Sequence, residues 1–299
     1  MKSVRRLIDG PIIHPGMLPG TDGDNINGAS LIAVPEWLPS RLGRFYMYFA
    51  HHAGSYIRLA YADDLAGPWQ IHPHGSLRLE DAPACRDHIA SPDVHVDPVA
   101  RRIVMFFHGP VRDGRRQRTF VASSADGIRF AAGPEEIADF YFRTVPWRDR
   151  WIGMSKGGVA YISARRDADY RPVAAAIFPG QHPSRNMPGD VRHVALHVIG
   201  DVLQVFYTEI GGAPEQIYRT TVDLAAPINA WTTAGRQLVL APQRPWEGAG
   251  LPLTRSRAGA APGPEHALRD PAIFSWSGAL YLLYAVAGES GIGIAELIE

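Results

Sequence analysis

The sequence predicts an all-β fold, a five-bladed β-propeller that forms one domain over residues 1–299. Short runs of aromatic and β-branched residues, which are typical of strands, recur between turn residues along the whole chain. These runs fall into five similar groups, which start about 61 residues apart on average between Asn27 and Asp270. Gly (30) and Pro (25) make up nearly a fifth of the chain, against about 12% on average, which leaves little room for long helices.

Each group supplies three or four strands, as expected for four-stranded antiparallel blades arranged radially. The first group comprises the predicted strands 29–35, 44–50, 57–62 and 67–71, and the second comprises 92–96, 102–108, 118–124 and 126–130. The third, weaker group comprises 142–145, 150–154 and 159–163. The fourth comprises 192–196, 201–208 and 216–221 with Trp231 beyond, and the fifth comprises 270–274, 279–284 and 291–295.

The fifth group lacks an outermost strand, and the N-terminus offers one. Residues 6–15 echo residues 69–73 of the first group, since both contain an Ile-His-Pro sequence. We therefore expect the N-terminal strand to complete the last blade and close the ring, which removes an edge that would invite aggregation. The Pro-, Gly- and Ala-rich segment 242–264 is the longest expected loop.

Composition and charge exclude several functional classes. The 30 basic residues balance the 30 acidic ones, whereas a nucleic-acid partner requires a basic surface. Hydrophobic residues make up 46% of the chain, so it can build a large core. Cys85 is the only cysteine, residues 1–10 do not resemble a signal peptide, and no apolar run approaches 20 residues. We expect a cytoplasmic protein without a membrane partner; its oligomeric state is left open.

Polar residues gather where a propeller would bring them together. Innermost strands start at one face of the ring, and the loops between second and third strands return to that face. The polar residues at the strand starts are Asp24, Asn25, Asn27, Ser91, Asp93, Arg143, Arg192, His193, Arg269 and Asp270. Those in the loops are His51, His52, His108, Lys156, Glu209 and Glu289. Burying so many polar groups is costly unless they serve a site, so we expect a central pocket.

Three carboxylates are the strongest catalytic candidates: Asp93, Glu209 and Asp270. Each also has a simpler explanation. Asp93 could accept hydrogen bonds from a turn, and Asp270 could be neutralised by Arg269 beside it. Glu209 could be an ordinary solvated residue of a hairpin loop.

The histidines do not form a recognisable metal site. His193 and His197 are four residues apart, a separation of about 13 Å along a strand, which is too far to share one ion. The chain has neither a cysteine-rich motif nor a His-Glu-x-x-His motif. Residues 291–293 lack the strand–loop–helix context of a dinucleotide site. We predict no metal ligands and no required cofactor.

Three segments resemble the five-bladed propeller glycoside hydrolases of families 43, 32, 117 and 130. These are residues 60–69 (AYADDLAGPW), residues 122–127 (ASSADG) and Arg269-Asp270-Pro271, and the ordering of the strands is similar along the whole chain. The resemblance implies a carbohydrate substrate and a pocket with an acid, a base or nucleophile, and a third carboxylate. Some of these relatives hold a structural Ca²⁺ in the central channel, and the sequence leaves open whether this protein does.

The resemblance transfers only in part. The base of family 43 would correspond to Asp24, provided that the loop carries it inward, and the second-blade carboxylate would correspond to Asp93. The third-blade acid has no Glu counterpart, because Arg143 and Lys156 stand at those places. Glu209, or a histidine acting as the acid as in family 117, would have to replace it.

The sequence thus predicts a glycoside hydrolase in which two of Asp93, Glu209 and Asp270 form the acid/base pair and the third orients the sugar. The predicted substrate-binding residues are Asp24, Asn27, His51, His108, Arg143, Lys156, Arg192, His193 and Arg269. Their cationic excess suggests an acidic or phosphorylated sugar. A polysaccharide lyase, a glycoside phosphorylase and a non-catalytic carbohydrate-binding propeller remain open alternatives; the sugar and its linkage are not predicted.

Overall fold

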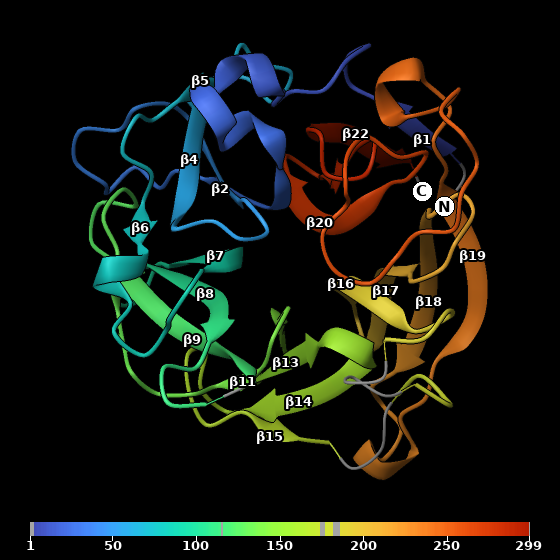
Figure 1. Ribbon diagram of the computed structural model, residues 1–299. Helices are drawn as coiled ribbons and strands as arrows, with labels where there is room; N and C mark the ends of the chain where they lie inside the picture. The colour runs from blue at the N-terminus through green and yellow to red at the C-terminus, as the bar shows by residue number, and fades with distance from the viewer. Residues whose placement is uncertain (1–2, 115, 174–176, 182–185, 299) are drawn as a thin grey trace.

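The computed structural model describes residues 3–114, 116–173, 177–181 and 186–298, and these form five antiparallel sheets around a central channel (Figure 1). The predicted five-bladed propeller is therefore confirmed. In the described residues, helical structure is limited to six short 3₁₀ turns: η1 (Pro15–Met17), η2 (Gly20–Asp24), η3 (Leu79–Asp81), η4 (Lys156–Gly158), η5 (Ile228–Ala230) and η6 (Pro245–Glu247). No helix in this part of the chain is long and apolar enough to cross a membrane.

The blades follow one another along the chain. Blade 1 contains β2 (Asn27–Ala33), β3 (Phe45–Ala50), β4 (Tyr56–Ala62), β5 (Gln70–Ile71) and β6 (Leu77–Arg78). Blade 2 contains β7 (Ala90–Asp97), β8 (Arg102–Pro110), β9 (Gln117–Ser124), β10 (Ala131–Ala132) and β11 (Ala138–Asp139). Blade 3 contains β12 (Arg143–Trp147), β13 (Arg150–Ser155), β14 (Val159–Ser163) and β15 (Arg171–Pro172).

The last two blades complete the ring. Blade 4 contains β16 (Val191–Ile199), β17 (Val202–Glu209), β18 (Ile217–Asp223) and β19 (Ala234–Leu240). Blade 5 contains β20 (Arg269–Trp276), β21 (Ala279–Ala285), β22 (Ile292–Ile298) and β1 (Ser3–Arg6). The innermost strands β2, β7, β12, β16 and β20 each form one edge of a sheet and surround the channel.

The N-terminus closes the ring as predicted. β1 pairs antiparallel with β22, from Ser3 opposite Ile298 to Arg6 opposite Ala295, and the two ends of the chain lie together in Figure 1. The closing strand is earlier than the predicted segment 6–15, of which Ile13 forms an isolated bridge with Ile292. Pro11 has no backbone N–H, so this segment cannot continue a full ladder.

The outermost strands differ most from the prediction. Residues 126–130 form a turn instead of the expected strand, because the Asp126 carboxylate accepts hydrogen bonds from the backbone N–H groups of Ile128 and Arg129. The short strands β10 and β11 take the outer place in blade 2. In blade 3 the outer strand is the two-residue β15, which the sequence did not predict.

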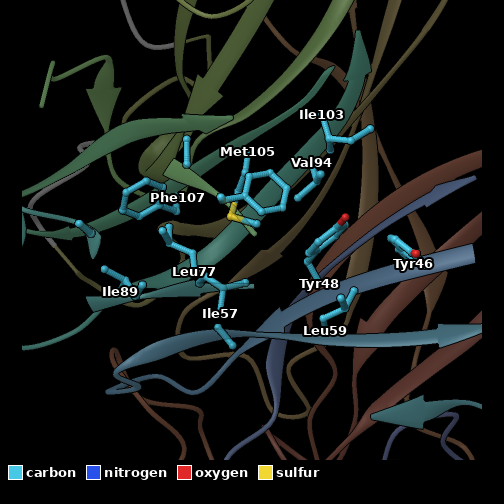
Figure 2. Packing of buried hydrophobic residues seen from close by; sticks show 14 of the residues in the cluster. Tyr46, Tyr48, Ile57, Leu59, Leu77, Ile89, Val94, Ile103, Met105 and Phe107 are labelled. Atoms are coloured by element: carbon cyan, nitrogen blue, oxygen red, sulfur yellow. The ribbon is translucent and has the colours of Figure 1, made fainter. Parts of the chain in front are cut away.

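The core lies between neighbouring blades, because successive side chains of each central strand point to opposite faces. In β3, Tyr46 and Tyr48 pack against blade 2, whereas Met47 and Phe49 belong to the cluster between blades 1 and 5. Figure 2 shows how Tyr48 and Leu59 face Met105 and the other side chains of β8 across the first of these interfaces. Both faces of the blade are buried, so β3 reads as the continuous apolar run Phe45–Ala50.

Met105 provides a test of this packing. Its side chain is fully buried between blades 1 and 2. We expect Met105→Ala to lower the free energy of unfolding by about 2–5 kcal/mol, since it removes apolar contacts and leaves a cavity. Chemical denaturation followed by tryptophan fluorescence measures this change. Met105→Leu, which conserves volume, should cost less than about 1.5 kcal/mol; equal losses for both variants would contradict the packing.

A β-bulge near the start of four innermost strands positions the site. The pairing register shifts between Asn27 and Ser30, and it shifts likewise between residues 90 and 93, 191 and 194, and 269 and 272. Within these bulges Gly28, Ser91 and Asp270 have positive φ angles of 62°, 50° and 48°. Bulges re-aim side chains, and they are frequent beside active sites. We call this end of the channel the mouth.

Candidate functional site

Ten residues line a small cavity at the mouth. They come from innermost strand starts, from the connections between second and third strands, and from the connections between blades: Asn27, His52, His88, Ala90, Ser91, His108, Gln117, Tyr141, His193 and Asp270. The cavity has a volume of about 10 Å³. A buried cavity needs at least about 10–15 Å³ to hold one water molecule, so this is a site for one water and not for a sugar ring.

Asp270 and His193 form a buried carboxylate–imidazole pair at this cavity. His193 Nδ1 contacts Asp270 Oδ1, and the backbone N–H of Gly28 lies 3.3 Å from Asp270 Oδ2. Burial alone would raise the pKa of Asp270, but His193, Arg269 and Arg192 together lower it well below the ordinary value. Asp270 is therefore ionised and holds the imidazole by Nδ1.

Burial has the opposite effect on the imidazole. It lowers the pKa of His193 below its ordinary value of 6.5, and this outweighs the effect of Asp270. His193 is therefore neutral near pH 7. With Nδ1 held by a carboxylate, Nε2 is the nitrogen that can accept a proton, as in other histidines oriented by an aspartate.

Tyr141 covers the cavity from the side of blade 3. Its ring centroid lies 4.1 Å from that of His193 and 4.7 Å from that of His108, both in edge-on contact. Burial raises the pKa of Tyr141 well above its ordinary value, so the phenol stays protonated. Its φ of 58° is unusual for a bulky residue, and such strained backbone is often found at functional sites.

His108 is the most deeply buried histidine of the mouth. Burial lowers its pKa well below the ordinary value, and the neighbouring His88 and His52 add to the effect. The Nδ1 atom of His108 is buried and has no hydrogen-bond partner. A buried polar atom without a partner is uncommon and costs free energy, which is consistent with a site that a ligand or water completes.

A network of buried charges supports the mouth from behind. Arg269 is fully buried and lies 3.2 Å from Glu215 and 3.3 Å from Glu289, and it also contacts Glu265. Arg192 lies 2.8 Å from Glu215. The charges of both arginines are thus neutralised by carboxylates, which reduces the cationic excess that suggested an acidic sugar.

The same network anchors the long loop 242–264. Arg192 donates hydrogen bonds to the carbonyl oxygens of Arg257 and Gly259, and the backbone N–H of Ala261 lies 3.3 Å from Glu289 Oε2. Ser256 adds a contact with Gly211. The loop therefore lies over blades 4 and 5 beside the mouth.

Glu215 is the centre of this network, since it contacts both Arg192 and Arg269. We expect Glu215→Ala to lower the free energy of unfolding by about 3–5 kcal/mol, because it leaves buried guanidinium groups uncompensated. Thermal and urea unfolding measure the loss. The exposed pair formed by Arg165 and Asp169 is a matched control, and Asp169→Asn, which suits the positive φ of 58° at this position, should cost less than about 1 kcal/mol. Equal losses would contradict the role of Glu215.

Asp93 and Arg143 face a different cavity from Asp270. They line a chamber of about 180 Å³ that lies further along the innermost strands, and we call it the lower chamber. Asp93 Oδ2 lies 2.8 Å from His95 Nε2 and accepts a 2.9 Å hydrogen bond from the backbone N–H of Thr144. Asp93 therefore does not form a carboxylate pair with Asp270 across one cavity, in contrast to the expectation from sequence.

Four other predicted residues lie away from the mouth cavity. Glu209 pairs with Arg236 of the outermost strand β19 at 2.7 Å, so its carboxylate is directed along the blade toward the outside. Asp24 is exposed in η2, so the loop does not carry it inward. His51 Nδ1 accepts a hydrogen bond from Ala53 N–H, and the adjacent His52 lines the mouth instead. Lys156 is buried against Phe140 and Asn186.

Several residues of the site were not selected from the sequence. Tyr141, His88 and Gln117 lie at the mouth, and Glu215 and Glu265 lie in the supporting network. Tyr141 and His88 lie in connections outside the predicted strand starts, so the strand pattern contained no signal for them. Of the predicted substrate-binding residues, Asn27, His108 and His193 line the mouth cavity, and Arg192 and Arg269 lie behind it.

In the described part of the chain, the mouth cavity and the lower chamber are each lined by a single carboxylate, Asp270 and Asp93 respectively. Within the described ranges, no three His, Cys, Asp or Glu side chains are placed to hold a metal ion. Ca²⁺ takes six to eight oxygen ligands, commonly including several carboxylates. Asp93 is the one carboxylate that lines the lower chamber in the described part of the chain, and it is bound to His95.

Comparisons with known proteins agree with this fold. No family model matches the chain. The uncharacterized protein R118 of Acanthamoeba polyphaga mimivirus is 34% identical over 301 residues, which cover 91% of this chain and 83% of that protein. Among solved structures, a putative glycoside hydrolase from Bacteroides ovatus superposes with a TM-score of 0.67 at 12% identity, covering 100% of this chain and 97% of that chain.

Two further structures have a known enzyme class. CoXyl43, a family 43 β-xylosidase/α-arabinofuranosidase from a compost metagenome solved with xylotriose, has a TM-score of 0.65 at 13% identity and covers 99% of this chain and 96% of its own. The family 32 β-fructofuranosidase of Bombyx mori has a TM-score of 0.59 at 14% identity. The match covers 97% of this chain and 62% of that chain. At these identities the likeness shows the fold, so the predicted resemblance to the propeller of families 43 and 32 is confirmed.

Proposed function

The chain belongs to the same family as mimivirus protein R118, and we propose that it is a glycoside hydrolase whose reaction takes place at the mouth. One observation carries the proposal. The buried Asp270–His193 pair adjoins a cavity that fits a single water molecule, at the end of the channel where the blade bulges direct polar side chains inward.

Hydrolysis requires one group that takes a proton from water and another that gives a proton to the leaving oxygen. In our proposal His193 is the base, because it is neutral near pH 7 and Asp270 orients it. Asp270 also stabilises the imidazolium that forms. The phenol of Tyr141, whose ring contacts that of His193, is the proposed proton donor to the leaving oxygen. Direct attack by the cavity water predicts inversion at the anomeric carbon, which ¹H NMR of the first product detects. It requires the Tyr141 phenol to move away from His193, so that donor and base lie on opposite sides of the scissile bond.

The site favours a neutral sugar. The arginines near the mouth are satisfied by other protein groups: Arg192 and Arg269 by carboxylates, and Arg143 in part by the carbonyl oxygens of Ser91 and Pro92. Asn27, Ser91 and Gln117 are neutral polar groups that line the cavity. The sugar itself would lie outside the cavity, so the Tyr141 ring must shift for the scissile bond to reach His193.

A substrate screen tests the proposal. Xylotriose is a suitable first oligosaccharide, since CoXyl43 was solved with it, and aryl xylosides, arabinofuranosides and fructosides extend the range. We expect turnover with reducing-sugar products, no need for phosphate, and no product that absorbs near-ultraviolet light. A phosphate requirement would indicate a phosphorylase, an unsaturated product a lyase, and binding without turnover a carbohydrate-binding propeller. Any of these results would overturn the proposal.

Metal removal gives a further prediction. The proposed proton transfers use only His193, Asp270 and Tyr141, so we expect the rate to be unchanged after EDTA treatment and gel filtration. Adding Ca²⁺ back should also leave it unchanged. A loss of activity that Ca²⁺ restores would contradict the proposed mechanism, while an unchanged rate with a lower melting temperature would still agree with it.

A further inference from the structure

The lower chamber contains polar groups that the mouth does not use. Its walls come from innermost strands, and its polar side chains include Asp93, His95, Arg143 and Ser275. We infer that this chamber is a second binding site, for one neutral polyhydroxy molecule the size of a monosaccharide. The site is separate from the mouth cavity and does not depend on the proposed function.

Arg143 gives the first reason. It is only 6% exposed, and its Nη1 donates to the carbonyl oxygens of Ser91 and Pro92 at 3.2 and 2.9 Å. Its Nε is buried without any hydrogen-bond partner, and within the described ranges it forms no ion pair with a carboxylate. Arg143 therefore brings a guanidinium without a paired carboxylate to the wall of the chamber.

Asp93 gives the second reason. Both of its hydrogen bonds, from His95 and from Thr144 N–H, go to Oδ2. Asp93 Oδ1 can therefore accept a hydrogen bond from a ligand, while Arg143 donates one. One carboxylate and one guanidinium give the chamber no net charge, so it suits hydroxyl groups, which donate and accept, better than it suits an ion.

The channel wall adds further partners. Because the five innermost strands are sheet edges, their channel-facing backbone N–H and C=O groups have no partner strand. Two of these groups are satisfied by side chains of the neighbouring blade: Val94 N–H by Ser30 Oγ, and Thr144 N–H by Asp93. Others remain for a ligand with several hydroxyl groups.

Size limits the ligand. The lower chamber has a volume of about 180 Å³. That is about six water volumes at roughly 30 Å³ each, and it lies below the roughly 300–1,000 Å³ of pockets for drug-sized ligands. One pentose or hexose fits these limits, and an oligosaccharide does not. Ser275 is exposed and also lines a neighbouring surface groove, so it marks the opening of the chamber away from the mouth.

A titration with D-xylose, followed by methyl NMR, tests the inference. The methyl groups of Leu31, Val145, Leu196 and Ile273 line the chamber and report on its contents. We expect saturable shifts of these signals in the wild-type protein and in Ser275→Ala. Ser275→Phe should block the opening and weaken binding at least tenfold. Because Ser275 is exposed, both variants should fold; unchanged melting temperatures check this.

Three results would overturn the inference: no saturable shift of these methyl signals up to 200-fold excess sugar over protein, equal binding by Ser275→Phe and wild type, or shifts confined to residues of the mouth. His193→Gln separates the two sites, because it should abolish turnover and leave chamber binding unchanged. The proposed function can therefore fail, through absence of turnover, while the chamber still binds xylose, and the reverse also holds.

Discussion

Replacing His193 with Gln, or Asp270 with Asn, is expected to lower kcat by about 10²–10⁴-fold with little change in KM, since proton transfer by a positioned side chain contributes this much. Gln at position 193 has no group that takes up a proton. Asn at position 270 cannot stabilise the imidazolium, and it can hold the ring in the wrong tautomer. The two changes should not be additive, because the residues act as one unit.

Glu209→Gln is the matched control for this prediction. Glu209 was equally prominent in the sequence, but its carboxylate pairs with Arg236 away from the mouth, so we expect this variant to keep its activity. Steady-state kinetics on the substrate found by the screen provides the measurement. Full activity of Asp270→Asn together with an inactive Glu209→Gln would place the chemistry elsewhere in the fold.

The pH dependence follows from the lowered pKa of His193. As a base it must be neutral, so kcat/KM should be constant near pH 7 and fall as the pH drops through the lowered pKa, below 6.5. This acidic limb should disappear in His193→Gln. An acidic limb that survives the substitution would belong to another group.

The second large effect is expected at Tyr141. Tyr141→Phe keeps the ring over His193 and removes the proposed proton donor, so kcat should fall by about 10²–10⁴-fold. A substrate with an activated leaving group, such as a nitrophenyl glycoside, needs little protonation and should lose much less. Comparing the two substrates in both proteins isolates the donor role from effects on packing.

Tyr141→Ala distinguishes proton donation by the phenol from the second function of Tyr141, in which its ring covers the cavity. Without the ring, His193 and His108 become accessible, and their imidazole hydrogen exchange, followed by mass spectrometry, should accelerate. Tyr141→Phe should leave the exchange slow. Full activity of Tyr141→Phe would show that Tyr141 is only a cover, and slow exchange in Tyr141→Ala would show that it does not close the cavity.

The fold could be predicted from sequence because its strands have a strong local signal. β3 is buried on both faces, so Phe45–Ala50 appears as an uninterrupted apolar run between turn residues, and similar, less continuous runs recur in the other blades. Outer strands carry little of this signal. Residues 126–130 include the apolar Ile128 and Phe130, but a single carboxylate, that of Asp126, turns the backbone by accepting hydrogen bonds from two N–H groups.

The site was harder to predict, because one residue of register decides where a side chain points. Asp93 and Asp270 both stand near the start of an innermost strand, yet the bulge in blade 2 places Ser91 at the mouth and Asp93 in the lower chamber. A signal for this was available. Aligning Pro92 with Pro271 pairs Ser91, and not Asp93, with Asp270.

The charge balance of the site depends on contacts that are distant in sequence. From their positions alone, Arg192 and Arg269 would be free cations that could bind a substrate. Their partner Glu215 is 23 residues from Arg192 and comes from a loop that the strand pattern did not select. Such pairings arise from the three-dimensional arrangement of the blades, so sequence position alone did not show that these arginines are neutralised.

The most direct test of the account is a crystal structure of Asp270→Asn with an oligosaccharide that the wild-type protein cleaves. The account predicts that the scissile bond lies at the mouth, with Tyr141 displaced and the anomeric carbon about 3–3.5 Å from a water molecule bound to His193 Nε2. A sugar bound beside Glu209 and Arg236, or held at the mouth with no group near its glycosidic oxygen, would contradict it.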